Sequence, residues 1–194
     1  MLFFLLYISL YVYTEQQEKL VYKTTTSQFS KEVNALLELN SKSQKTTIVD
    51  LTFWDGLVNY LKTNDKEWYE IHITNEFGNY ADVDYVGVYD IQDQLVNKTA
   101  TGQITSANFI PKAVFPELYK SKYLRFYMKI PEGIVEVFGA TIHPSNDPKK
   151  NKYKPSGYLF MVRLLDKEYI PYLEKICSSK VFLLPPNKVV NKHE

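Results

Sequence analysis

Two tryptophans and one carboxylate are the side chains whose types and spacing best suit binding chemistry in this sequence. Trp54 is followed directly by Asp55, and Trp68, the other of the two tryptophans, lies on the next helix-like segment. An indole offers apolar surface and one N–H donor, and a carboxylate pairs with a cationic group. These three residues therefore either line a small-molecule cavity, or anchor helices on a sheet while Asp55 caps a helix or forms a local ion pair.

A β-rich segment adds two tyrosines to this group. Tyr85 and Tyr89 share one strand face by period-two spacing, and Gly87 between them admits the close approach of a ligand or of another backbone. Packing in the core is the alternative role. If the candidates converge, they enclose a cavity between paired helices and the concave face of the sheet, suited to a small polar or cationic metabolite. The convergent set would be Trp54, Asp55, Trp68, Tyr85, Tyr89 and His143.

Two further residues carry possible binding chemistry. His143 comes before Pro144 at the end of a predicted strand, where an imidazole contacts a ligand or senses pH. Arg163 lies inside an apolar run, so it either pairs with a carboxylate such as Asp166 or binds an anionic ligand. We include both residues among the expected ligand-binding residues.

The sequence contains no recognisable catalytic or cofactor motif. No Ser/His/Asp order is convincing, Cys177 lacks a paired histidine in any readable motif, and no glycine-rich phosphate loop occurs. The three histidines and single cysteine show no metal-ligand spacing, so we expect neither a metal nor a cofactor. A net charge of +1 gives no electrostatic case for nucleic acid. We therefore expect a binding or sensing module and not an enzyme.

The first residues form an unbroken apolar run that predicts a membrane contact. A spanning helix needs about 20 apolar residues, and this run has roughly 13 without preceding basic residues. We interpret residues 1–14 as the remnant of a transmembrane or anchor helix, with a buried helix in a dimer as the alternative. Residues 15–45 are expected to continue it as a stalk-like helix that pairs two copies of the chain, and residues 46–184 to form the domain, before a tail at 185–194.

Periodicity predicts an α+β domain built on one sheet of about five mostly antiparallel strands, with a long N-terminal helix. A helical pattern includes Leu51, Trp54 and Leu57, and Asp65 is the expected N-cap of the helix carrying Trp68. The predicted strands cover 83–89, a return strand from 95, 123–130, 134–142 and 158–165. The remaining predicted elements are a short helix at 113–121, a helix at 167–177 capped by Asp166, and an apolar run at 181–184.

Taken in order, these segments resemble a CHASE4 domain. The first matching stretch runs from Asp50 through the two tryptophans and Asn75 to Asp90. The second runs from Gly139 to Asp166 and ends in Gly-Tyr-Leu-Phe-Met-Val-Arg-Leu-Leu-Asp, which is similar to the family pattern G-x-L-x-x-G-R-x-L-D. The resemblance extends from about Asp50 to Cys177.

The resemblance implies a PAS-like or Cache-like fold and ligand sensing outside the cell, as part of a membrane-bound signalling receptor. It does not imply a particular ligand. Val162 replaces a glycine that the family often has, and the segment 92–94 lacks the usual glycine. The family also continues with further strands, so we expect either a fragment or a sheet completed by a partner. The alternative function is a stand-alone, membrane-anchored interaction module that dimerises or binds another receptor.

Overall fold

The computed structural model describes residues 2–79, 83–165, 169–178 and 180–181. Contacts divide the chain into two units. Residues 40–167 form the first, which we call the sheet unit, and residues 1–39 with 168–194 form the second, the terminal unit.

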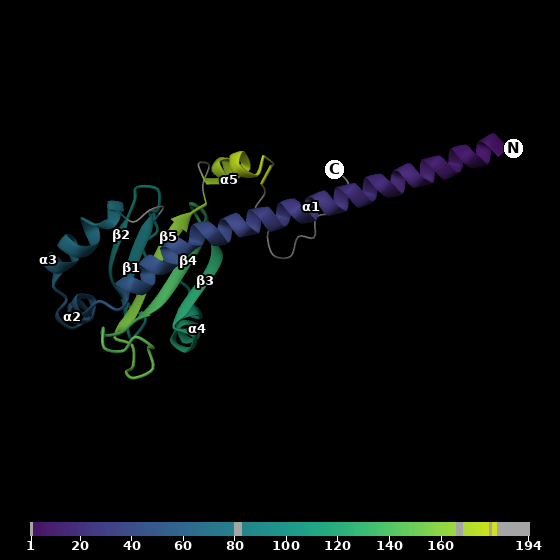
Figure 1. Cartoon of the computed structure of the whole chain (residues 1–194). Coiled ribbons are helices and arrows are strands. Elements are labelled where there is room, and N and C mark those ends of the chain that lie inside the picture. The colour runs from purple at the N-terminus through teal and green to yellow at the C-terminus, as the bar shows by residue number, and fades with distance from the viewer. Residues whose placement is uncertain (1, 80–82, 166–168, 179, 182–194) are drawn as a thin grey trace. The chain divides into compact units, whose positions relative to one another are not determined.

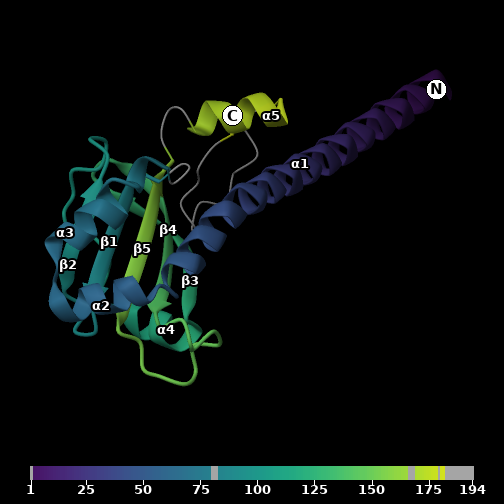
Figure 2. The same ribbon diagram turned by 60° about the vertical axis from the view of Figure 1, so that its left-hand side comes forward.

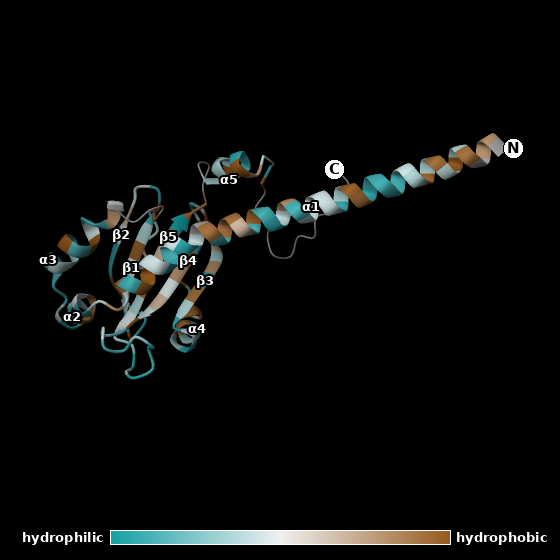
Figure 3. Ribbon diagram, in the orientation of Figure 1, coloured by the Kyte–Doolittle hydropathy of each residue, from teal (hydrophilic) through white to brown (hydrophobic). Residues whose placement is uncertain are grey.

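The chain begins with the 50-residue helix α1 (Leu2–Leu51), shown in Figure 1. Its continuity confirms the prediction that the apolar start and the following segment form one helix. The weak helix formers Thr24 to Ser27 do not interrupt it, although their propensity is poor. Hydrophobic residues gather toward the N-terminal end of α1 (Figure 3), where large apolar side chains such as Phe3 and Leu10 are exposed. Within the described residues, no helix has both the length and the apolarity needed to cross a membrane.

The sheet unit contains one antiparallel sheet of five strands in the order β2-β1-β5-β4-β3 (Figure 2). This architecture confirms the predicted α+β fold with a long N-terminal helix. The strands are β1 (Tyr85–Asp90), β2 (Leu95–Ala100), β3 (Tyr123–Ile130), β4 (Gly133–Ile142) and β5 (Gly157–Leu164).

Several helices complete the fold. The predicted helix through Leu51 and Trp54 is in fact two helices, since α1 ends at Leu51 and α2 (Asp55–Thr63) begins after Trp54. Then come α3 (Lys66–Tyr69), the π-helix η1 (Glu70–Thr74) and the short 3-10 helix η2 (Phe77–Asn79). α4 (Val114–Ser121) precedes β3, and α5 (Tyr169–Cys177) belongs to the terminal unit. The predicted cap Asp166 and the apolar residues 182–184 lie outside the described residues.

Each face of the sheet has its own hydrophobic core. On one face, Ile48 of α1, Leu57 of α2 and Tyr69 of α3 pack on alternate strand residues such as Val88 and Phe138. On the other face, α4 and the segment 101–113 pack on the opposite set. Alternation along each strand explains why both sets are apolar, because a sheet covered on both faces needs two buried rows. We call these the helix face and the loop face.

Candidate functional site

The two tryptophans lie together at the edge of the helix face. Their ring centroids are 4.9 Å apart, and His72 lies 5.1 Å from Trp54 and 4.9 Å from Trp68. Trp54 is 36% exposed, whereas Trp68 is partly buried and stacks on Tyr60 at 5.6 Å. The predicted N-cap is confirmed, because the Asp65 carboxylate accepts a hydrogen bond from the Trp68 amide at 3.0 Å.

Gly56 allows this tryptophan pair to pack closely. A Cβ at that position would lie 2.7 Å from Cζ2 of Trp68 and 3.3 Å from Cε2 of Trp54, so both indoles occupy the space that a side chain would need. The pair is therefore built on the first turn of α2, where only glycine leaves enough room.

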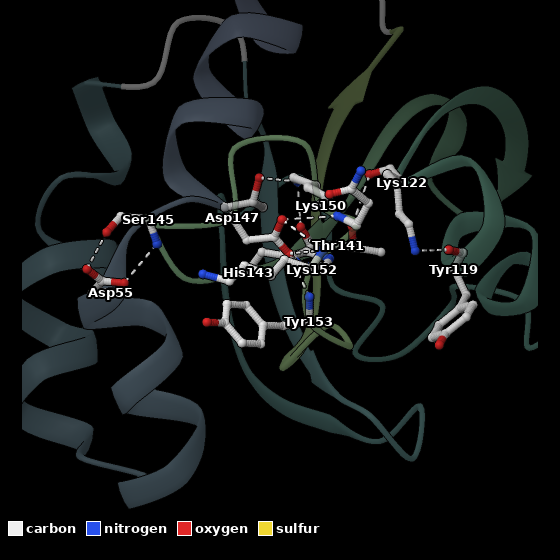
Figure 4. Close-up of polar contacts among 12 residues, drawn as sticks. Asp55, Tyr119, Lys122, Thr141, His143, Ser145, Asp147, Lys150, Lys152 and Tyr153 are labelled. Atoms are coloured by element: carbon white, nitrogen blue, oxygen red, sulfur yellow. Dashed lines mark hydrogen bonds and ion pairs between the residues drawn. The ribbon is translucent and has the colours of Figure 1, made fainter.

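Asp55 is directed toward the long loop between β4 and β5 (Figure 4). Its carboxylate accepts hydrogen bonds from the Ser145 amide at 2.9 Å and the Ser145 hydroxyl at 2.6 Å. These two bonds lower the pKa of Asp55. The residue thus connects the start of α2 to the loop, and this role is neither the helix cap nor the local ion pair that the sequence suggested.

Tyr85 and Tyr89 lie on the loop face, on the opposite side of the sheet from the tryptophans. The Tyr85 hydroxyl donates to the Ala107 carbonyl at 3.2 Å, and the Tyr89 hydroxyl donates to Asn108 Oδ1 at 3.1 Å. Burial raises the pKa of both phenols. A Cβ at Gly87 would lie 2.7 Å from the Tyr85 ring, so the glycine accommodates that ring.

The expected convergence of six residues in one cavity is therefore wrong. Period-two spacing correctly placed the two tyrosines on a common face, but the helices with the tryptophans cover the other face. Whether any of the candidates contacts a ligand is a separate question, to which we return below.

His143 belongs to a buried polar network at the end of β4 (Figure 4). Its Nδ1 lies 3.1 Å from the Asp147 carboxylate, and its Nε2 is buried with no hydrogen-bond partner among the described residues. Burial lowers the pKa of His143, a shift that the Asp147 hydrogen bond opposes and the Lys150 charge reinforces. The imidazole is therefore held neutral and has no access to solvent.

Asp147 organises the loop around this histidine. Its carboxylate accepts hydrogen bonds from the backbone amides of Asn151, Lys152 and Tyr153, at 3.0 to 3.1 Å. Desolvation acts to raise the pKa of Asp147, but these amides and His143 outweigh it and lower the pKa to about 2. The lysine-rich loop between β4 and β5 is thus folded around a buried carboxylate.

Lys150 is the one lysine of that loop whose side chain enters the interior. Its Nζ donates to the Thr141 carbonyl at 2.5 Å and to Thr52 Oγ1 at 2.9 Å, and it lies 4.7 Å from the centroid of the Phe53 ring. Burial, together with the Lys122 charge, lowers the pKa of Lys150 to about 8. The ammonium group therefore fastens the end of α1 to the loop and to β4.

Arg163 pairs with Glu136, which faces it directly across β4 and β5. The Glu136 carboxylate also accepts from Arg125 Nε at 2.6 Å and from the Ser41 hydroxyl at 2.8 Å. Burial acts to raise the pKa of Glu136, but the Arg163 charge and these hydrogen bonds prevail and lower it. The structural ion pair that the sequence allowed for Arg163 is confirmed, although with Glu136, since Asp166 lies outside the described residues.

A surface hollow of about 350 Å³ lies between the β1–β2 turn and α4. Its lining combines three aromatic rings with a carboxylate and an ammonium group. The lining residues are Ile91, Asp93, Phe115, Pro116, Tyr119, Lys120 and Tyr158. Among the described residues, no group of three or more histidine, cysteine, aspartate or glutamate side chains is arranged to hold a metal ion.

The sheet unit thus combines a five-stranded antiparallel sheet with the end of a long N-terminal helix. The chain belongs to the CHASE4 domain family, which matches residues 36–183. It therefore contains an extracytoplasmic sensor domain with a role in signal sensing. No curated protein matches the chain closely enough to serve as a relative.

Sequence reasoning missed Glu136, Asp147, Lys150 and the hollow. Glu136 carried a readable signal, because a single carboxylate stands within the apolar strand 134–142, as Arg163 stands within 158–165. Two isolated opposite charges on neighbouring buried strands indicate an ion pair. Lys150 carried no comparable signal, since it is one of several lysines in a polar segment.

Proposed function

We propose that this chain is the extracytoplasmic ligand-sensing part of a membrane-bound signal-transduction receptor, of the histidine kinase, cyclic-di-GMP or chemoreceptor type. The observation that carries the proposal is the family match combined with α1. One helix runs from Leu2, through an apolar exposed stretch, to buried residues that contact the sheet. A change in the sheet that moved Ser41 or Thr52 would act directly on this helix.

In this proposal, residues 1–14 contact the cell membrane and the domain faces the periplasm or the exterior. The test is the coding sequence on either side of residues 1–194. A receptor requires two membrane helices and an output domain, whereas a stop codon directly after Glu194 would favour the alternative, a stand-alone membrane-anchored module.

We also propose that two copies pair in parallel through their N-terminal helices, since the exposed apolar side chains of α1 require a covering surface. Leu20 and Val21 are both exposed on the helix. Leu20→Cys and Val21→Cys, each combined with Cys177→Ser, should form a disulfide-linked dimer on mild oxidation. Tyr153→Cys in the same background is the matched control, because Tyr153 is exposed in the sheet unit. Equal cross-linking of all three variants would contradict pairing through α1.

The residues expected to bind the ligand remain a proposal, and their positions divide them into two groups. Trp54 and Trp68 are partly exposed, so direct contact is open to them. Tyr85, Tyr89, His143 and Arg163 are buried and would act through their neighbours. Asp55 is exposed, but its carboxylate is already hydrogen-bonded to Ser145. Trp68→Ala and Asp55→Ala test this: if both variants stay folded and lose a ligand-induced thermal shift, the binding role stands.

A further inference from the structure

The hollow on the loop face has a rigid aromatic floor. Phe115 is 2% exposed and Tyr158 is 4% exposed, and their rings meet edge to face with centroids 5.2 Å apart. The Tyr89 ring packs against the Phe115 ring, with centroids 5.3 Å apart. Because the floor residues belong to the buried core of the loop face, close packing holds their rings in place.

Asp93 presents a carboxylate at one wall of this hollow. The residue has φ of 63°, so it lies in the left-handed region, and its amide donates to the Asp90 carbonyl at 3.2 Å. The turn itself is held by the Asp90 carboxylate, which accepts from the Gln92 and Gln94 amides at 2.9 Å. The Asp93 carboxylate makes no hydrogen bond or ion pair with any residue that the structure describes, so it is available to a ligand.

The electrostatic surroundings of Asp93 favour a cation. Burial and the nearby Asp90 charge raise the pKa of Asp93, and Lys112 opposes them only in part. Burial and the charge of Asp93 likewise raise the pKa of the Tyr158 phenol, which places carboxylate and aromatic floor close together. An added positive charge would relieve the repulsion between the two carboxylates.

We propose that this hollow binds a small organic ammonium ion, with its nitrogen at the Asp93 carboxylate and its apolar part on the rings of Phe115 and Tyr158. The proposal rests on the sensing function and names the ligand class and its place. A carboxylate next to aromatic faces attracts an ammonium group through an ion pair and through the ring quadrupoles. The volume of about 350 Å³ is at the small end of ligand pockets, which suits a compact molecule.

Lys120 at the rim does not oppose this assignment. Its ammonium lies 3.7 Å from the Glu117 carboxylate one turn earlier on α4, and its side chain is 75% exposed. The Lys120 ammonium group therefore lies along the helix surface, where the Glu117 carboxylate partly compensates its charge. Lys120→Gln, which removes the charge, should strengthen binding of an ammonium ion slightly.

The test compares 2-phenylethylammonium with 2-phenylethanol, a neutral molecule of similar size, by calorimetric titration of the full chain in a neutral detergent. The ammonium ion should bind more tightly than the alcohol. Asp93→Asn should weaken its binding about fivefold, the effect of a partly exposed ion pair. Asparagine tolerates the left-handed backbone of this position, so the variant retains the turn. Glu67→Gln, which removes an exposed carboxylate from α3 on the helix face, should leave the affinity unchanged.

Three results would overturn the proposal. Equal affinity for the ammonium ion and the alcohol would make the hollow a purely apolar site. Unchanged binding to Asp93→Asn would exclude the carboxylate. Binding that survives Asp93→Asn but is lost in Trp68→Ala would place the ligand at the tryptophan pair, which refutes this site and leaves the sensing function intact. Conversely, a receptor whose output ignores an ammonium ion bound at Asp93 would show that the hollow binds the ion without a role in sensing.

Discussion

Glu136 and Lys150 are both buried charges beneath the final turns of α1, yet their surroundings differ. Glu136 faces two guanidinium groups and the Ser41 hydroxyl, so opposite charges compensate its own. Lys150 is held by a carbonyl, a hydroxyl and an aromatic face, which offer only dipoles and a quadrupole. The pKa of Glu136 is lowered, which favours its charged form, and the pKa of Lys150 is lowered to about 8, which disfavours its charged form.

The difference shows two ways of attaching one helix to a sheet. The Glu136 attachment stays ionised throughout the physiological range, since the carboxylate loses its proton well below neutral pH. The pKa of Lys150 lies close to physiological pH, because burial lowers it and no neighbouring carboxylate raises it to the same extent. The first therefore keeps its charge at every physiological pH, and the second contributes a stability that changes with pH.

The largest expected loss of stability comes from removing the Glu136 carboxylate, whose charge two arginines compensate. Glu136→Ala should lower the free energy of unfolding by about 3–5 kcal/mol, because the guanidinium of Arg163 then stays buried without its carboxylate. Urea denaturation measures this loss. In the double variant Glu136→Met with Arg163→Met, both charges are absent, and the loss should be clearly smaller than in the single variant. A single variant within about 1 kcal/mol of the parent would show that the pair is not needed.

The second prediction concerns pH and separates the two centres. Between about pH 8 and 10.5 the unfolded chain keeps a proton on Lys150 that the folded chain has released. The stability of the parent, measured relative to Lys150→Met, should therefore rise over this window, by about 2 kcal/mol. Comparing the two proteins at each pH cancels the buried tyrosines, which titrate in the same range. Lys149→Met is the matched control, since Lys149 is exposed. The stability of the parent measured relative to Lys149→Met should show no such rise.

The smallest loss of stability should come from weakening the exposed hydrogen bonds between Ser145 and Asp55. Ser145→Ala removes the hydroxyl donor to Asp55 but keeps the amide donor, so the loss of stability should be below that of Glu136→Ala. Hydrogen exchange at the first amides of α2 should increase. Ser156→Ala, in the same loop but without a side-chain bond to Asp55, supplies the comparison, and an equal increase there would refute a specific role for Ser145.

The hairpin of β3 and β4 shows what could be predicted from sequence. Both strands are rich in β-branched and aromatic residues, and Pro131 to Gly133 mark the turn between them, so local patterning determines the element almost to the residue. The break between α1 and α2 could not be predicted in this way. Leu51, Trp54 and Leu57 keep helical spacing across it, and no glycine or proline marks the interruption.

The candidate site was less predictable because it depends on pairing between distant segments. Period-two spacing placed Tyr85 and Tyr89 on one face, but which face the helices cover is decided by the whole sheet. The register that sets Glu136 opposite Arg163 is likewise a property of the β4–β5 pair and not of either strand. The inward path of Lys150 depends on the loop geometry around Asp147, for which the sequence has no periodic signal.

The packing of Trp54 against Trp68 has a consequence for optical measurements. Both indoles of the chain emit from a single corner between α2 and α3, beside the same imidazole. Intrinsic tryptophan fluorescence therefore samples the helix face alone. A molecule that binds in the hollow at Asp93 would change this emission only if binding alters the conformation of the helix face. A fluorescence change on its addition would therefore report conformational coupling between the two faces of the sheet.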